Sequence, residues 1–196
     1  MVLGSTPEGP VGGRIGVLGP AAAEVDGGYG GVMTNDLARI AEQQRRLTFA
    51  GFDENSAWQL GADLRRRAVE RGVAVTIEVR LRGETVFLHA MAGTTPANAD
   101  WARRKRTLVE WLHRPSYAVG LEDQRSGRSS LEAMGLSDRD VASHGGSFPI
   151  VVDGVGCVGA ATVSGLPQRE DHELVVEALA AHRGIDIGEV RLDPPI

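Results

Sequence analysis

The apolar residues of this chain recur with a helical period in some segments and alternate in others. Spacings of three and four residues predict a helix from Asn35 to about Leu47 and a second, capped by Asp53, that ends near Arg71. The buried stripe of the second helix is predicted to contain Ala57, Leu60, Leu64 and Ala68. Alternation then predicts strands over residues 73–81 and 84–92, joined at Gly83. These strands form an antiparallel hairpin with one face packed on helices.

The second half of the chain repeats this order of helices followed by a hairpin. Thr95-Pro96 begins a helix that ends near Trp111 or His113, because proline is favoured in the first turn. Shorter helical segments are predicted at 116–125, 130–134 and 137–144. Phe148 to Val163 form the second hairpin, where Asp153-Gly154 favours a two-residue type I′ turn. A last amphipathic helix covers 168–182.

The predicted order of elements is α-α-β-β-α-α-β-β-α. Two hairpins with segregated helices indicate an α+β fold around an antiparallel sheet rather than a doubly wound parallel one. Residues 1–32 hold ten glycines and three prolines without periodicity, so they are expected to form a disordered arm. Residues 33–196 are expected to form a single domain, and a chain of 196 residues with 42% hydrophobic content can build a sizeable core.

Composition narrows the class of protein. A formal charge of -5 gives no general attraction to nucleic acid or to an anionic membrane, and no apolar run reaches the roughly 18 residues of a membrane span. The single cysteine, Cys157, cannot form an internal disulfide and lies in a predicted strand as a small hydrophobic residue. The single cysteine fits a reducing compartment, so a cytoplasmic location is expected. The charge predicts that neither nucleic acid nor a membrane is a partner.

The glycines of the second hairpin have two interpretations. Gly156 and Gly159 remove bulk from one strand, which indicates close approach either of another backbone or of a flat ligand. Together with Gly154 they spell G-x-G-x-x-G, but that dinucleotide fingerprint requires a following helix. Here a strand follows, so no nicotinamide or flavin cofactor is predicted.

The densest charge is the basic run Arg103, Arg104, Lys105 and Arg106. Four successive helical residues point around most of the helix, so they cannot all face one partner. Lys105 shares its stripe with Trp101, Leu108 and Leu112, which leaves two interpretations: an ion pair with a carboxylate of the protein, or a contact to a ligand. Asp100 and Arg104, four residues apart, are expected to form a surface pair.

The five histidines lack the spacing of a metal site, and no structural zinc is predicted. His144 ends a predicted helix and precedes Gly145-Gly146, which leaves space for a planar or anionic group; the alternative is an exposed histidine at a helix C-terminus. His172 and His182 are predicted to be solvated. Ser143 and Ser147 have no readable base or nucleophile elbow, so no catalytic constellation is predicted and enzymatic activity stays open.

Two motifs resemble a known family over residues 36–183. The first is G-G-S-F-P-I-V-V-D-G-V-G-C-V-G-A-A-T-V-S-G at 145–165, followed by Asp171; the second is G-T-T-P-x-N-x-x-W-x-x-R-K at 93–105. Both are similar to motifs of the HbpS- and GlcG-type haem-binding or haem-degrading domain family. The stretch S-H-G-G-S-F-P-I at 143–150 is typical of its UPF0303 branch.

The resemblance implies an α+β sandwich, homo-oligomeric assembly and, for some members, haem binding or degradation. Our leading hypothesis is an oligomeric module that binds haem or another small planar, anionic ligand in a groove between helix 101–105 and the second hairpin. His144 would be the haem axial ligand, and its predicted companions are Gly145, Gly146, Trp101, Arg103, Arg104 and Lys105. The alternatives are an adaptor that binds partner proteins and no tetrapyrrole, and a haem-degrading or redox enzyme.

Overall fold

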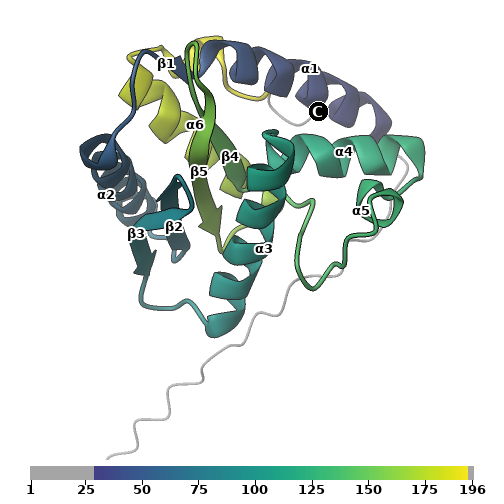
Figure 1. The fold of residues 1–196 in the computed structure, drawn as a ribbon, viewed down its shortest axis with the longest axis horizontal. Coiled ribbons are helices and arrows are strands. Elements are labelled where there is room, and N and C mark those ends of the chain that lie inside the picture. Colours follow the sequence, from purple (N-terminus) through teal and green to yellow (C-terminus); the bar gives the residue numbers. More distant parts are fainter. Residues whose placement is uncertain (1–28, 194–196) are drawn as a thin grey trace, which may run out of the picture.

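The computed structural model describes residues 29–193, and their side chains from Asn35 onward (Figure 1). The elements in chain order are α1 (Tyr29–Arg46), β1 (Thr48–Phe49), α2 (Glu54–Glu70), β2 (Thr76–Leu81), β3 (Glu84–Ala90), α3 (Pro96–Leu112), α4 (Ser116–Ser126), α5 (Ser130–Ala133), β4 (Ser147–Val152), β5 (Gly156–Ser164), α6 (Gln168–Arg183) and the short 3₁₀ helix η1 (Ile187–Glu189). The predicted arm lies outside the described residues except for 29–32, which begin α1. None of the helices within 29–193 is long and apolar enough to cross a membrane.

The sheet has five strands in the order β1-β4-β5-β2-β3. Both predicted hairpins are present, and β2 pairs with β5 to join them, all in antiparallel register. The prediction of a purely antiparallel sheet is wrong at one edge, because β1 runs parallel to β4 through Thr48–Val151 and Phe49–Val152. A two-residue strand is too short to show alternation, so the sequence pattern could not indicate it. The α+β class is confirmed, with a mixed sheet.

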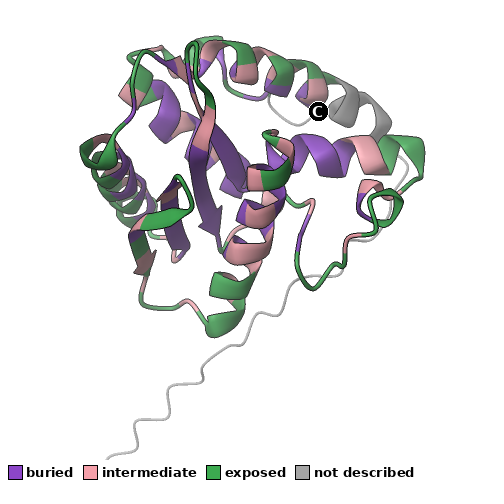
Figure 2. Cartoon of the chain, viewed as in Figure 1, coloured by how far each residue is buried: buried purple, intermediate pink, exposed green. Residues whose placement is uncertain are grey.

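Helices cover both faces of this sheet. α2 and α6 pack on one face, where Ile77 and Val79 of β2 are fully buried, and α3 packs on the other, which Glu78 faces. The strands β2, β4 and β5 are therefore mostly buried, while the edge strand β3 and the outer sides of the helices are largely exposed (Figure 2). Gly159 of β5 allows the backbone of β2 to approach, since a Cβ atom there would overlap the carbonyl oxygen of Arg80. Backbone approach, rather than a flat ligand, accounts for this glycine.

The capping residue, the apolar stripe and the terminal glycine of the sequence predicted α2 correctly. Asp53 caps it by accepting a hydrogen bond from the Ser56 amide at 2.8 Å, and the chain turns at Gly72, whose φ is +65°. The predicted stripe is fully buried: Ala57, Leu60, Leu64 and Ala68. Strong caps and a complete apolar stripe are sufficient to define a helix from the sequence alone.

Two local predictions were wrong. Residues 138–140 form a turn and residues 141–144 have no regular structure, instead of the predicted helix, because Arg103 and Arg104 bind the carbonyl oxygens of residues 138–140. The β4–β5 connection has three residues, 153–155, instead of two. Gly154 has a φ of +75°, but Asp153 is not among the residues with positive φ, which a type I′ turn requires.

A buried polar network joins α1 to α6. Asp36 accepts two hydrogen bonds from Arg169, at 2.9 and 3.0 Å, and one from the Tyr117 hydroxyl at 3.2 Å. His172 is fully buried, contrary to the solvated position expected for it, and its Nε2 lies 2.8 Å from Oε1 of Gln43. Gln43 in turn donates to the carbonyl oxygen of Val190, and the other imidazole nitrogen of His172 has no hydrogen-bond partner within the described structure.

Candidate functional site

The first three turns of α3 and the segment before β4 bring three of the predicted site residues together. The rings of Trp101 and His144 are 4.9 Å apart between centroids and meet edge to face at 66°. The guanidinium carbon of Arg104 lies 3.9 Å from the centre of the Trp101 ring. Trp101 therefore has a cation on one side and an imidazole beside it, at the surface of the molecule.

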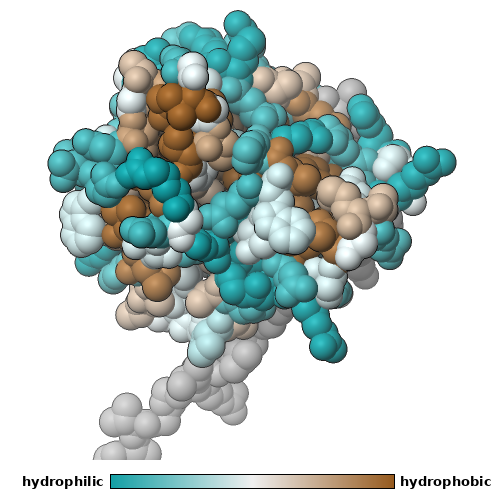
Figure 3. Space-filling model, viewed as in Figure 1, coloured by the Kyte–Doolittle hydropathy of each residue, from teal (hydrophilic) through white to brown (hydrophobic). Residues whose placement is uncertain are grey.

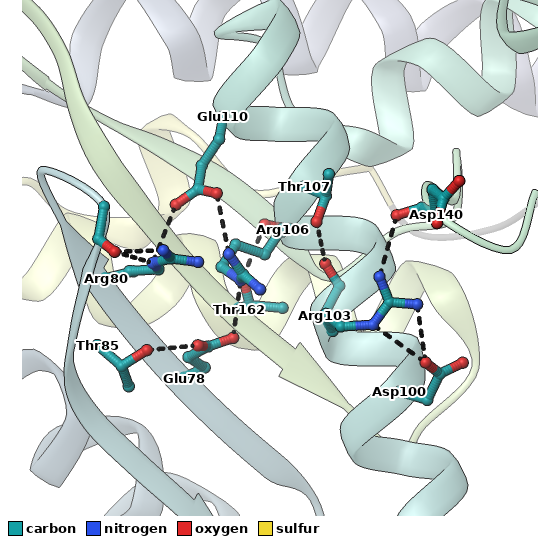
Figure 4. Close-up of polar contacts among 12 residues, drawn as sticks. Glu78, Arg80, Thr85, Asp100, Arg103, Arg106, Thr107, Glu110, Asp140 and Thr162 are labelled. Carbon is teal, nitrogen blue, oxygen red and sulfur yellow. Dashed lines mark hydrogen bonds and ion pairs between the residues drawn. The ribbon is translucent and has the colours of Figure 1, made fainter. Parts of the chain in front are cut away.

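Arg103 and Arg104 are already bound to protein groups. Arg103 pairs with Oδ1 of Asp100 and contacts the carbonyl oxygen of Asp140 (Figure 4). It also donates to the carbonyl oxygen of Arg139 at 2.7 Å. Arg104 pairs with Oδ2 of Asp100, as predicted, and donates to the carbonyl oxygen of Asp138 at 3.0 Å. The side chain of Arg103 is 43% exposed and that of Arg104 only 16%, so Arg103 is the more accessible to a ligand.

Lys105 forms an ion pair inside the protein. Its Nζ lies 2.8 Å from Oδ2 of Asp171 and 3.3 Å from the carbonyl oxygen of Val163. Both side chains are almost fully buried, and Asp171 also accepts from the amides of Gly165 and Leu166. Of the two interpretations of Lys105, the geometry supports the structural ion pair.

Gly145 and Gly146 do not line open space. A Cβ atom at Gly145 would overlap the carbonyl oxygen of Gln168. At Gly146, where φ is +120°, it would overlap the carbonyl oxygen of Val163 and lie 2.9 Å from Nζ of Lys105. Protein atoms therefore fill the space that the sequence analysis assigned to a ligand, and the two glycines let the backbone cover the Lys105–Asp171 pair.

We expect Gly146→Ala to lower the free energy of unfolding by about 2–4 kcal/mol, because it adds a clash to an unfavourable backbone conformation. The matched control is Gly154→Ala, where φ is also positive but the added methyl group meets nothing within 4 Å. Urea unfolding of both variants separates the packing cost from the backbone cost. Equal losses for the two variants would contradict the proposed close packing over Lys105.

The predicted groove between α3 and the second hairpin is closed. Ala102, Lys105 and Val109 of α3 are buried between the helix and the sheet. Toward the end of α3, a chain of ion pairs joins this helix to the first hairpin (Figure 4). Glu110 of α3 pairs with Arg80 of β2 and with Arg106. Arg106 also pairs with Glu78 of β2, which accepts a hydrogen bond from Thr85 of β3.

His144 has the properties of an accessible neutral ligand. Its side chain is exposed, and no hydrogen bond to its ring occurs among the described residues. Partial desolvation, followed by the positive charges of Lys105 and Arg104, lowers the pKa of its imidazole. The neutral ring keeps a lone pair that can bind haem iron, and Trp101 offers an apolar surface beside it. The residues present therefore fit an edge-bound haem with one protein ligand.

The sequence analysis identified these residues but not how they contact one another. Trp101 and Arg104 are three apart on α3, a spacing at which helical side chains meet, so their stacking carried a readable signal. The backbone acceptors at 138–140 carried none, because a carbonyl oxygen is the same in every residue. Asp171 was noted only as the residue that follows the first motif, and its pairing with Lys105 joins residues 66 positions apart.

Comparison with known proteins agrees with the fold and with the motifs. The sequence model of a family described as "Haem degrading protein HbpS-like" matches residues 52–180. A UPF0303 protein of Azotobacter vinelandii is 53% identical over 161 residues, covering 82% of this chain and 97% of the relative. A UPF0303 protein of Acidobacterium capsulatum is 49% identical over 160 residues, with the same coverage of both chains.

Solved structures share the architecture. The Ybr137w protein superposes with a TM-score of 0.68 at 25% identity, over 76% of this chain and 87% of its own. HbpS gives 0.53 at 22% identity, over 66% and 88%. A PduOC:Heme complex gives 0.56 at 19% identity, over 68% and 95%, and at this level the similarity concerns the fold alone.

Proposed function

Because the chain belongs to the HbpS-like family of haem-degrading proteins and to its UPF0303 branch, we propose that it binds haem, or another flat anionic tetrapyrrole. The binding surface consists of Trp101, Arg103 and His144, and we call it the Trp101–His144 surface. The observation that carries the proposal is the exposed imidazole of His144, held beside the Trp101 ring at 4.9 Å. The haem-bound neighbour of the same fold supports it.

Each residue has a defined task in this proposal. His144 would hold the iron of a bound haem through its imidazole nitrogen, and the haem would supply the iron and its redox chemistry. Trp101 covers apolar porphyrin surface, and Arg103, with its half-exposed side chain, pairs with a carboxylate of the ligand. Lys105 and the two glycines act indirectly, since they fix the backbone that carries His144.

We expect His144→Ala to weaken haemin binding at least about tenfold and to change the Soret spectrum, because the variant loses the iron ligand. Titration of the full chain with haemin, followed by absorbance, measures both quantities. His89→Ala is the matched control, since His89 is also a partly exposed histidine but lies on β3. An unchanged spectrum and affinity in His144→Ala would remove the axial role.

We further propose that the protein is a homo-oligomer. β3 is an edge strand of the sheet and carries Leu88, which is 64% exposed; Trp58 of α2, which contacts Phe87 of β3, is 60% exposed. Brown, hydrophobic surface is visible in Figure 3 where Figure 1 places the first hairpin. Phe148, which lies in the second hairpin, is 1% exposed and cannot contribute to such an interface.

Native mass spectrometry of the purified protein, with and without haemin, tests the function as a whole. One haem per chain on a discrete oligomer supports the proposal. An oligomer that ignores haemin favours an adaptor that binds no tetrapyrrole. Product formation from haem in the presence of an electron donor would favour a haem-degrading enzyme instead.

A further inference from the structure

The segment that carries His144 is attached to α3 mainly through its backbone. Arg103 and Arg104 donate to the carbonyl oxygens of Arg139 and Asp138, at 2.7 and 3.0 Å. The amide of Ala142 donates in return to the carbonyl oxygen of Arg104, at 3.1 Å. Within the segment, the amides of Asp140 and Val141 both donate to the carbonyl oxygen of Ser137, which makes a single turn. The bonds to α3 satisfy carbonyl oxygens that a continued helix would have paired, so the conformation of the segment depends on α3.

Arg104 is the residue that connects this segment with the aromatic pair. Its guanidinium binds Asp100 at 2.9 Å and the carbonyl oxygen of Asp138 at 3.0 Å, and it lies 3.9 Å from the Trp101 ring centre. A planar guanidinium can make in-plane hydrogen bonds while its face stacks on an indole, whereas an ammonium cannot do both. Trp101 in turn contacts His144.

We propose that Arg104 is a positioning residue: it holds Trp101 and the segment 137–144 so that His144 is presented to the ligand, and it does not itself pair with ligand carboxylates. This inference rests on the proposed function. The side chain of Arg104 is only 16% exposed, and its Nε and Nη1 already donate to Asp100 and to the carbonyl oxygen of Asp138, which leaves little of it to meet a second anion.

Arg103 is the natural comparison for Arg104. It lies on the same helix, shares the carboxylate of Asp100 and also donates to a carbonyl oxygen of the segment. It differs in two respects, since no stacking on an aromatic ring is found for it among the described residues and its side chain is 43% exposed. Comparing variants of Arg103 and Arg104 therefore distinguishes a residue that contacts the ligand from one that positions the site.

Binding of haemin and of haemin dimethyl ester, which lacks the two free carboxylates, distinguishes the two roles. We expect Arg104→Ala to weaken both ligands by a similar factor of about ten, from loss of the stack and the charged hydrogen bonds. Arg104→Lys should not restore binding. Arg103→Ala should weaken haemin more than the ester. A penalty of Arg104→Ala that disappears with the ester, or rescue by lysine, would overturn the positioning role.

Hydrogen exchange without any ligand tests the same inference separately. In Arg104→Ala, the amides of residues 137–144 should exchange about tenfold faster or more, while those of β4 and β5 keep the wild-type rates. Unchanged exchange in the segment would overturn the inference even if haemin binds. If wild-type protein binds neither ligand, the proposed function fails, and the exchange experiment still decides whether Arg104 positions the segment. Arg104→Lys provides the same test should the alanine variant fold poorly.

Discussion

Lys105→Met is expected to lower the free energy of unfolding by about 3–5 kcal/mol, because it leaves the carboxylate of Asp171 buried without its cation. Methionine keeps most of the length and apolar volume of the lysine, so the loss reports charge rather than a cavity. Burial raises the pKa of the Asp171 carboxyl against the opposing effects of Lys105 and two backbone amides, which indicates how far solvent is excluded here. Urea unfolding monitored by circular dichroism measures the loss.

The double variant Lys105→Met/Asp171→Asn provides the control. The neutral amide oxygen can still accept from the amides of Gly165 and Leu166, and no charge stays buried, so most of the lost stability should return. Glu70→Gln, which breaks an exposed pair with Arg66, should leave stability unchanged within error. A Lys105→Met variant as stable as the wild type would show that the pair is not sealed from water.

The second large effect concerns pH and comes from His172. Complete burial lowers the pKa of its imidazole from 6.5 to about 3, so the folded protein keeps the ring neutral while the unfolded chain takes up a proton below pH 6.5. Because the unfolded state then binds more protons, this histidine makes stability fall as pH decreases from 6.5 toward 3. The expected slope approaches about 1.4 kcal/mol per pH unit once the pH is well below 6.5, and the loss between pH 6.5 and 4.5 is about 2 kcal/mol.

The comparison with His172→Gln isolates this contribution. Glutamine does not titrate, and its amide can still donate to Oε1 of Gln43. Unfolding free energies measured from pH 7 to 4.5 should converge as pH falls, since only the wild type loses the histidine contribution and other groups titrate in both proteins. Parallel curves for the two proteins would mean that the imidazole is hydrated or protonated in the folded state.

The parts of the fold that could be predicted are those determined by residues close together in the sequence. α2 has a capping aspartate, a four-residue buried stripe and a terminal glycine within one stretch of sequence, and all three were interpreted correctly. β1 is different, because two residues become a strand only through pairing with Val151 and Val152, about 100 positions away. The conformation of 137–144 depends in the same way on arginines more than 30 residues earlier.

The candidate site could likewise be predicted only where residues close in sequence determine it. The sequence placed Trp101 and Lys105 correctly on α3, but it assigned His144 to the end of a helix at 137–144 that does not form. Helical spacing left a carboxylate of the protein or a ligand as the partner of Lys105. It could not identify Asp171 as that partner, nor show that backbone from β5 and α6 fills the space at Gly145 and Gly146. The prediction that His172 is a solvated helix position was wrong. His172 is buried because α1 returns across α6 and supplies Gln43.

The polar network between α1 and α6 also bears on what counts as the minimal folding unit. The family match begins at residue 52, yet Asp36 and Gln43 lie before that point and bind Arg169 and His172. A fragment that begins at residue 52 would keep all the strands except β1 but expose the guanidinium and the imidazole that α1 satisfies. An excision that follows the family boundary would therefore be expected to give an unstable, aggregation-prone product, whereas one that retains α1 would keep these buried groups paired.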